Sequence, residues 1–542
     1  MSAPRETDLF PDVVTGRHRK TSAAGITGRM AQPVLSFLLR PRDAAHALLV
    51  VAFWFALFFG LSDYGAVSEE MRATLAPAIF AHLCVSLLLF GVPPHARNIV
   101  TIACLLLLTV MLLVYLQTMP GMFSAHPAWK SAGLFTSHPP DLIASITPAD
   151  DRFALLSVAL PFGFFISALV LFDTDDRARA ALRVFAVGGA IISFLALVQF
   201  LAFPSRLLLS EKLYYRDSLT GVFVNRNTAA TFFSVTLLVA LSHFWRAAAQ
   251  TDLPRVWAMA NSNIKLYAED RRRLLRAVMW GGSCLVVFLA FVLTQSRGGV
   301  AAGLTGLVFL SAMMVLKPDY LAKHSVPGAV RASRRRRLVV LIGIVVVVLL
   351  MALVFSGQLL LRASALGFDD ARFCFMPGIL TVLSDNLPWG TGLASFAQAY
   401  APYHNPACGI DTLLVRAHNV YLEGMIAFGW FFVPLAVVFV TTLMLVFARG
   451  MRKRKRYRFA GNLGFALLLV LALHSLVDFS IQIPGFAISF ATVVAPLVTI
   501  CVRPSGQEGK RRRRSSNGVS GEQEMHSLPV EVVSAGASGM DR

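Results

Sequence analysis

The chain has 542 residues, of which 56% are hydrophobic and 15% are charged, and its formal net charge is +20 at pH 7. Such a composition is typical of a protein that crosses a membrane many times and excludes a set of soluble domains. The positive charge occurs in short runs between apolar segments, where it sets membrane orientation, so it does not indicate a nucleic-acid partner.

Twelve apolar runs are long enough to cross about 30 Å of hydrocarbon as helices. Helices are expected because each span must satisfy its own backbone hydrogen bonds within lipid. The runs lie near 45–62, 74–92, 98–118, 153–172, 180–202, 227–246, 277–295, 299–316, 338–357, 419–446, 459–479 and 484–502. The sequence therefore predicts an all-α polytopic membrane domain over residues 44–502.

Lysine and arginine are distributed unevenly between the connecting segments. With the N-terminus inside, the inner segments hold 39 of the 50 Lys and Arg residues. The positive-inside rule then predicts that both termini are cytoplasmic. Residues 1–43 form a basic N-terminal tail, and residues 503–542, which have no apolar period, are predicted to form a disordered C-terminal tail. The largest outer loop covers residues 358–418.

Three predicted helices begin on this outer side with unusual residues. Their sequences are "GVFVNRNTAA" from Gly221, "TQSRGGVAAG" from Thr294 and "HNVYLEG" from His418. A helix N-terminus presents unpaired backbone N–H groups and the positive end of a dipole. Three such ends together would favour an anion, and at a membrane surface a pyrophosphate is the natural candidate.

Charged and flexible residues strengthen that prediction, although each also has a structural interpretation. Arg226 and Arg297 add full positive charges, and the pair Gly298–Gly299 would let a ligand approach the backbone. The same arginines can instead extend to the lipid headgroups, and the glycines can serve close helix packing. Asn227 and Asn419 are of the type that caps helices.

The outer loop carries further candidates. Arg372 and Arg416 add positive charge near the proposed site. Cys374 and Cys408 would be free to form a disulfide if this side faces an oxidising compartment. Of the six cysteines, the other four fall in apolar spans and are interpreted as small apolar residues.

A second group of polar residues occurs in "HSLVDFSIQIPG". His474 and Asp478 stand four residues apart, so the sequence predicts them on one helix face near the outer end of a span. Ionisable groups at that depth normally face a protein interior or a wet cavity. The spacing is consistent with a structural hydrogen bond between His474 and Asp478, and also with a role for both in lining the site. The same two interpretations apply to Glu423, which lies one turn into the helix that begins at His418.

Four segments of the chain resemble the bacterial O-antigen ligase and polymerase family. They are "NRNTAA", "LTQSRGG", "LSDNLPWGTGLASFAQAY" and "HNVYLEGMIAFGW", which lie within about 221–446. Ligases of this family show a His-Asn pair, nine residues and then Gly, as do His418–Asn419 and Gly429 here. Phe432 stands where the ligases often have a small residue or tyrosine.

The resemblance implies a GT-C-like membrane fold and an inverting, metal-independent glycosyltransferase without a cofactor. Such an enzyme in the inner membrane moves a glycan from undecaprenyl pyrophosphate to a sugar hydroxyl of lipid A core or a growing polysaccharide, on the periplasmic side. His418 would be the base or orienting group, and Arg297 would bind the pyrophosphate. The wider substrate-binding set would comprise Arg226, Arg372, Arg416, Asn419, Gly298, Gly299, His474 and Asp478.

A transporter or flippase of lipid-linked glycans is the alternative, because twelve spans with both ends inside also describe such proteins. No internal repeat is apparent, although repeats are common in transporters. Polar residues should lie at the membrane midplane in a transporter, whereas here they gather at the outer helix ends.

Overall fold

The computed structural model describes residues 41–135, 141–251, 256, 258–259, 261–262, 267–316, 342, 371–408 and 414–504, without the side chains of 371–373. The chain divides into two compact units, Met1–Val51 and Ala52–Arg542. Of the first unit, only residues 41–51 are described, and they begin a helix that continues into the second unit. The contacts discussed below lie within the second unit.

Eleven segments of the described chain are long and apolar enough to cross a membrane, which confirms a mostly helical polytopic membrane protein. The expected span at 338–357 and most of the two predicted tails lie outside the described residues. The eleven segments comprise α2 (Pro41–Ser62), α3 (Glu69–Phe90), α4 (Arg97–Gln117), α6 (Pro148–Leu171), α7 (Asp175–Ala202), α8 (Arg226–Ala249), α10 (Ala268–Leu293), α11 (Arg297–Leu316), the α16–α17 segment (Val420–Lys453), α18 (Arg458–His474) and α19 (Pro484–Val502).

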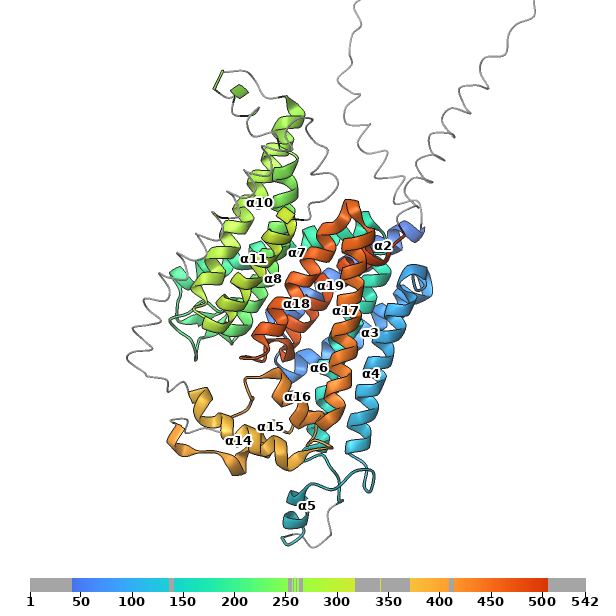
Figure 1. Ribbon diagram of the computed structural model, residues 1–542, viewed down its shortest axis with the longest axis vertical. Helices are drawn as coiled ribbons and strands as arrows, with labels where there is room; N and C mark the ends of the chain where they lie inside the picture. The colour runs from blue at the N-terminus through green and yellow to red at the C-terminus, as the bar shows by residue number, and fades with distance from the viewer. Residues whose placement is uncertain are drawn as a thin grey trace, which may run out of the picture. The chain divides into compact units, whose positions relative to one another are not determined.

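Two of these helices form the core of the second unit (Figure 1). All residues of α19 are buried, and it packs against α6, α7, α17 and α18. α8 is buried over most of its length and packs against α7, α10, α11 and α18. By contrast, α4 exposes large apolar side chains such as Leu105 and Leu108, as a lipid-facing helix does. The whole of α19 and the N-terminal two thirds of α8 are therefore surrounded by protein.

Small residues allow the core helices to approach closely. A methyl group on Gly306 of α11 would lie 2.3 Å from Val470 of α18, and one on Gly450 of α17 would lie 2.3 Å from Cys501 of α19. Van der Waals contact across small residues is the usual basis of helix association in lipid. A larger side chain at either position would push two helices apart.

Short elements cover one end of the helices. A two-stranded antiparallel hairpin, β1 (Arg206–Leu207) and β2 (Ser210–Glu211), follows α7. α5 (Pro127–Ala132), α14 (Ala371–Asn386) and α15 (Phe396–Tyr400) lie in the connecting segments, with α14 and α15 beside α16 (Figure 1). The remaining elements are single 3-10 turns, namely η1 (Pro94–Ala96), η2 (Ala401–Tyr403), η3 (Pro406–Cys408), η4 (Gly429–Phe431), η5 (Lys455–Tyr457) and η6 (Ser480–Gln482).

The segment that contains α14 and α15 has its own small core. Buried apolar side chains from α14, α15 and α16 pack together, among them Ile379, Tyr400 and Ile426. A disulfide joins Cys374 of α14 to Cys408, with a sequence separation of 34. The segment is therefore fixed both by packing onto α16 and by a covalent bond.

Two helices differ from the spans that the sequence predicted: one is broken, and the other is shorter. The helix expected over 419–446 is broken at Gly429, which has a φ of 57° and separates α16 (Val420–Phe428) from α17 (Phe432–Lys453). The N–H of Trp430 there donates to the carbonyl of Pro388 at 3.0 Å, so a loop contact replaces a helical one. The helix expected over 459–479 ends at His474, and Asp478 lies in the following turn.

The disulfide gives the first test. Closing a loop of this length is worth roughly 3–4 kcal/mol in the chain-entropy model. Replacing Cys374 and Cys408 by serine should therefore make residues 371–408 open more often, which limited proteolysis and hydrogen exchange will report as faster cleavage and lower protection. The free cysteines Cys84 and Cys104 serve as the control, because their double serine variant removes no bond.

Free thiols at both positions in the folded, non-reduced protein would contradict this account. So would a Cys374→Ser/Cys408→Ser variant that resists protease as well as the wild type.

Candidate functional site

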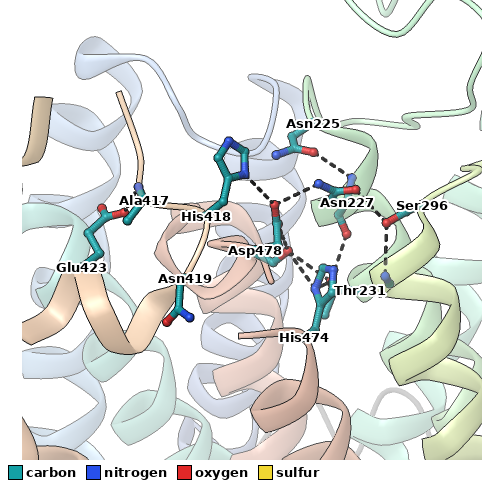
Figure 2. A network of polar contacts seen from close by, with 12 residues as sticks. Asn225, Asn227, Thr231, Ser296, Ala417, His418, Asn419, Glu423, His474 and Asp478 are labelled. Carbon is teal, nitrogen blue, oxygen red and sulfur yellow. Dashed lines mark hydrogen bonds and ion pairs between the residues drawn. The ribbon is translucent and has the colours of Figure 1, made fainter. Parts of the chain in front are cut away.

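A buried carboxylate, Asp478, joins several helix ends into one polar network (Figure 2). Its side chain is 1% exposed. Oδ1 accepts a hydrogen bond from Nδ2 of Asn227 at 2.9 Å, and Oδ2 accepts one from Oγ of Ser480 at 2.8 Å. Nδ1 of His418 lies 3.5 Å from Oδ1, within reach of an electrostatic contact but too far for a close hydrogen bond. Asp478 thus ties the starts of α8 and α16 to the turn after α18.

The charge state of Asp478 follows from these contacts. Burial alone would raise the pKa of its carboxyl, because it disfavours the charged form. The hydrogen-bond donors and the two neighbouring histidines outweigh burial, and the pKa lies below its ordinary value. The carboxyl is therefore ionised at neutral pH, and the site holds a buried negative charge.

Asn227 extends the network to α11. Its Oδ1 accepts a hydrogen bond from Oγ of Ser296 at 2.7 Å, and the same Oγ accepts from the N–H of Gly299 at 3.2 Å. The helix cap of α8 is Asn225, whose Oδ1 accepts from the N–H of Asn227 at 2.7 Å. Asn227 therefore does not cap α8, although its residue type suggested that it would. Its side-chain amide instead connects α8 to Ser296 before α11 and to Asp478.

His474 forms the inner side of the network. It is the last residue of α18, it is 2% exposed, and its Nδ1 lies 2.6 Å from Oγ1 of Thr231. Oγ1 of Thr231 donates to the carbonyl of Asn227 at 3.0 Å. The same hydroxyl lies 3.1 Å from Oγ of Ser480, and the tautomer of the imidazole decides which atom donates between Thr231 and His474. His474 contacts protein groups on α8, so its observed role is to join α18 to α8.

His418 lies on the opposite side of Asp478 and is 24% exposed at its side chain. Its backbone has a φ of 51°, in the left-handed region that a residue with a Cβ rarely adopts. The imidazole packs edge-on against Phe479, with 5.0 Å between the ring centroids. Figure 2 shows that the second ring nitrogen points away from Asp478. One nitrogen therefore faces the buried carboxylate while the other is available to a ligand.

Contacts on both sides of His418 hold it in this unusual conformation. Before it, the N–H of Ala417 donates to Oε2 of Glu423 at 2.9 Å, and Nη1 of Arg416 donates to Oε1 at 2.8 Å. After it, Oδ1 of Asn419 accepts from two backbone N–H groups of α16, and its Nδ2 donates to the carbonyl of Leu476 at 3.0 Å. Backbone strain of this kind persists where the surroundings determine the conformation, as is common at functional sites.

Arg297 is the first residue of α11 and is exposed. Within the described chain, its guanidinium has neither a hydrogen-bond nor an ion-pair partner. The next residue, Gly298, lies close to Val477 and His474 of the turn after α18. An unpaired arginine therefore begins a helix beside the network, where helix dipoles add to its attraction for an anion.

Of the other arginines predicted to bind substrate, two have protein partners, and the side chain of the third is not among those that the structure describes. Nη1 of Arg226 donates to Oγ of Ser218 at 3.3 Å, and its guanidinium packs 5.2 Å from the ring centre of Tyr215. Arg416 is bound to Glu423, as described above. Arg372 lies in α14, in the stretch whose side chains are not described.

Three predicted ligand-binding residues have structural roles here. A methyl group on Gly298 would meet Val477 at 2.7 Å, and one on Gly299 would meet Ala230 at 2.6 Å. Protein side chains thus fill the space beside both glycines, so close packing explains them better than an approaching ligand. The amide of Asn419 is used by the cap of α16 and by Leu476.

The sequence alone did not indicate the contact between His418 and Asp478. The interval between them contains a complete span, so no local period connects them. The sequence indicated a structural hydrogen bond or a place in the site for Glu423, but it did not indicate Arg416 as the partner. Among the described residues, no three His, Cys, Asp or Glu side chains lie close enough to share a metal ion.

No protein-family model matches this chain, and no curated protein matches it either.

The network gives a stability prediction. Asp478→Ala would leave Asn227, Ser480 and His418 without their shared acceptor, and breaking a buried pair costs about 3–5 kcal/mol. The matched control is Glu211→Ala, which removes an exposed carboxylate from its pair with Arg216 and should cost at most about 1 kcal/mol. Thermal and denaturant unfolding of the purified protein in detergent will compare the two.

The dependence on pH has a definite sign. Because folding lowers the pKa of Asp478, its carboxylate stabilises the fold at pH above its ordinary value of about 3.9. That contribution is lost as pH falls through the lower native value.

Equal costs for Asp478→Ala and Glu211→Ala near neutral pH would contradict the central position of Asp478.

Proposed function

We propose that the chain is a membrane glycosyltransferase of the O-antigen ligase or polymerase type. In this proposal it transfers a glycan from undecaprenyl pyrophosphate to a sugar hydroxyl of lipid A core or of a growing polysaccharide, on the periplasmic side of the bacterial inner membrane. The observation that carries the proposal is the pairing of His418 with buried Asp478 beside the helix that Arg297 begins. The resemblance of the same segments to that family adds to it.

His418 would act as the base toward the acceptor. The oxygen of the acceptor hydroxyl attacks the anomeric carbon from the side opposite the pyrophosphate, so the configuration inverts. The free ring nitrogen of His418 takes the hydroxyl proton as the new bond forms. Asp478 orients the imidazole through Nδ1 and stabilises the imidazolium that results, as a paired carboxylate does for a catalytic histidine.

Arg297 would act toward the leaving group. As the bond between the anomeric carbon and the pyrophosphate oxygen breaks, its electron pair leaves with undecaprenyl pyrophosphate and negative charge grows there. An arginine with no partner in the described chain can bind that charge through two parallel hydrogen bonds. The N-termini of α8 and α11 add fixed dipoles, which are already oriented before the reaction starts.

The distribution of buried charge favours this proposal over a transporter or flippase. Within the described spans, the buried carboxylates Asp151, Asp175 and Glu423 all lie in the first turn of their helices. Asp478 lies beyond a helix end. Ion-coupled transport usually places such groups near the membrane midplane, and none of these four carboxylates lies in the middle of a described helix. Asp175 belongs to the opposite end of the helices, where it pairs with Arg454.

Substitutions at the two proposed active residues test the function. His418→Ala should lower glycan transfer by about 100-fold or more, the usual contribution of a general base. Arg297→Ala should lower it by about 30- to 1000-fold, from the loss of about 2–4 kcal/mol of charge stabilisation. Arg297→Lys should fail nearly as badly, because an ammonium group cannot form the two-pronged contact. The assay is transfer from purified lipid-linked glycan in proteoliposomes, with a chelator present.

Two matched controls separate these effects from damage to the fold. Arg152 is an exposed arginine in the first turn of α6, and His404 packs on Tyr400 outside the network. Arg152→Ala and His404→Ala should both transfer at near wild-type rates. Near-normal turnover in His418→Ala would remove the proposed base, and a requirement for added divalent metal would contradict the mechanism.

A further inference from the structure

A polar cavity lies at the end of α8 opposite to the candidate site. It has a volume of about 140 Å³, and five arginines line it, namely Arg179, Arg183, Arg246, Arg273 and Arg276. His243 of α8 also lines it and lies about 24 Å along the helix axis from Asn227 at the usual rise per residue. The cavity is therefore separate from the candidate active site, although both use α8.

The arginines outnumber their acidic partners. Arg179 pairs with Asp176, and Nε of Arg273 lies 3.0 Å from Oε1 of Glu269. Arg183 and Arg276 are exposed, and neither has a hydrogen bond or ion pair to the described residues. Positive charges gathered around one cavity repel one another. A bound anion would reduce this electrostatic repulsion, which the carboxylate partners neutralise only in part.

Aromatic groups form the wall between these charges. The ring of His243 stacks on Trp280, with 4.6 Å between their centroids, and Arg246 packs 4.1 Å from the ring centre of Phe459. Nε2 of His243 is buried and has no hydrogen-bond partner among the described residues. A buried ring nitrogen without a partner is costly, and it lines the same cavity as the arginines.

The surroundings suit an amphipathic ligand. α10 contributes Arg273, Arg276 and Trp280 to the cavity, and on its other faces it exposes large apolar residues, including Leu275, Val278 and Met279, as a lipid-facing helix does. Tryptophan and arginine near the end of an apolar helix are typical of the headgroup region of a membrane. The cavity therefore lies at the basic end of a helix whose apolar side chains face lipid.

We propose that this cavity binds a phosphate-bearing anion, either the headgroup of an anionic membrane lipid or a free phosphate. The arginines bind the phosphate oxygens, and the stacked rings of His243 and Trp280 form the wall beside them. Basic pockets between membrane-spanning helices bind anionic lipid headgroups in this manner. The proposal does not rest on the proposed glycosyltransferase activity.

The test is a binding measurement on the purified full-length protein in a neutral detergent. Three probes are titrated: short-chain phosphatidylglycerol, short-chain phosphatidylcholine and inorganic phosphate. Native mass spectrometry counts bound lipid, and the thermal midpoint reports binding because a ligand that prefers the folded state stabilises it. We expect phosphatidylglycerol to raise the midpoint and to remain bound, and phosphatidylcholine to do neither.

Variants then locate the binding. Arg183→Gln/Arg276→Gln should weaken phosphatidylglycerol binding by about tenfold or more, the effect of losing roughly 1.5–3 kcal/mol of charged hydrogen bonds. The matched control is Arg452→Gln/Lys455→Gln, which removes two exposed charges from the end of α17 and the turn after it, outside the cavity lining. It should bind as the wild type does.

Each outcome decides the proposal. Binding of phosphatidylglycerol but not of inorganic phosphate identifies a lipid headgroup site, and comparable binding of inorganic phosphate identifies a soluble anion. Equal weakening in the two double variants would show only general attraction to a basic surface and would overturn the proposal. A wild-type protein that does not distinguish phosphatidylglycerol from phosphatidylcholine and does not bind inorganic phosphate would overturn it without any variant.

Discussion

The burial of one carboxylate, Asp478, is the constraint on which the candidate site depends. A charged group removed from water must be matched by hydrogen-bond donors or by opposite charge, or the structure loses several kcal/mol. Asp478 obtains its donors from Asn227 of α8 and from Ser480 of its own turn, and it lies against His418 at the start of α16. These elements are therefore held together by one charge. Removing that charge would leave its hydrogen-bond donors without an acceptor and His418 without its partner.

The surrounding fold supplies rigidity that the network alone cannot. α19 is buried along its whole length and α8 over most of its own, so their ends cannot shift without disturbing several neighbours. Glu423 binds the segment before His418, and Asn419 fixes the segment after it. The left-handed backbone of His418 is thus imposed from both sides. Holding a reacting group in one geometry before the substrate arrives is a recognised part of catalysis.

Hydropathy predicted the position of most spans, because membrane insertion depends on the composition of each segment. Eleven of the expected spans are helices, and the three helix starts singled out for their polar residues meet in one network. Residue type did not predict which asparagine caps α8, since Asn225 and Asn227 are chemically alike and only the backbone path distinguishes them. The contact of His418 with Asp478 and the filling of the space beside Gly298 depend on how α18 and α11 pack. Tertiary contacts of this kind leave no period in the sequence.

The proposed function requires that a lipid-linked pyrophosphate binds where α8, α11 and α16 begin. Photo-crosslinking tests it most directly, with an undecaprenyl pyrophosphate analogue that carries its reactive group beside the phosphates. The crosslinked peptides of the wild-type protein, identified by mass spectrometry, should come from residues near Arg226, Arg297 and His418, and excess unlabelled lipid should suppress them. Crosslinks confined to the opposite end of α8, or to the middle of the spans, would contradict the account.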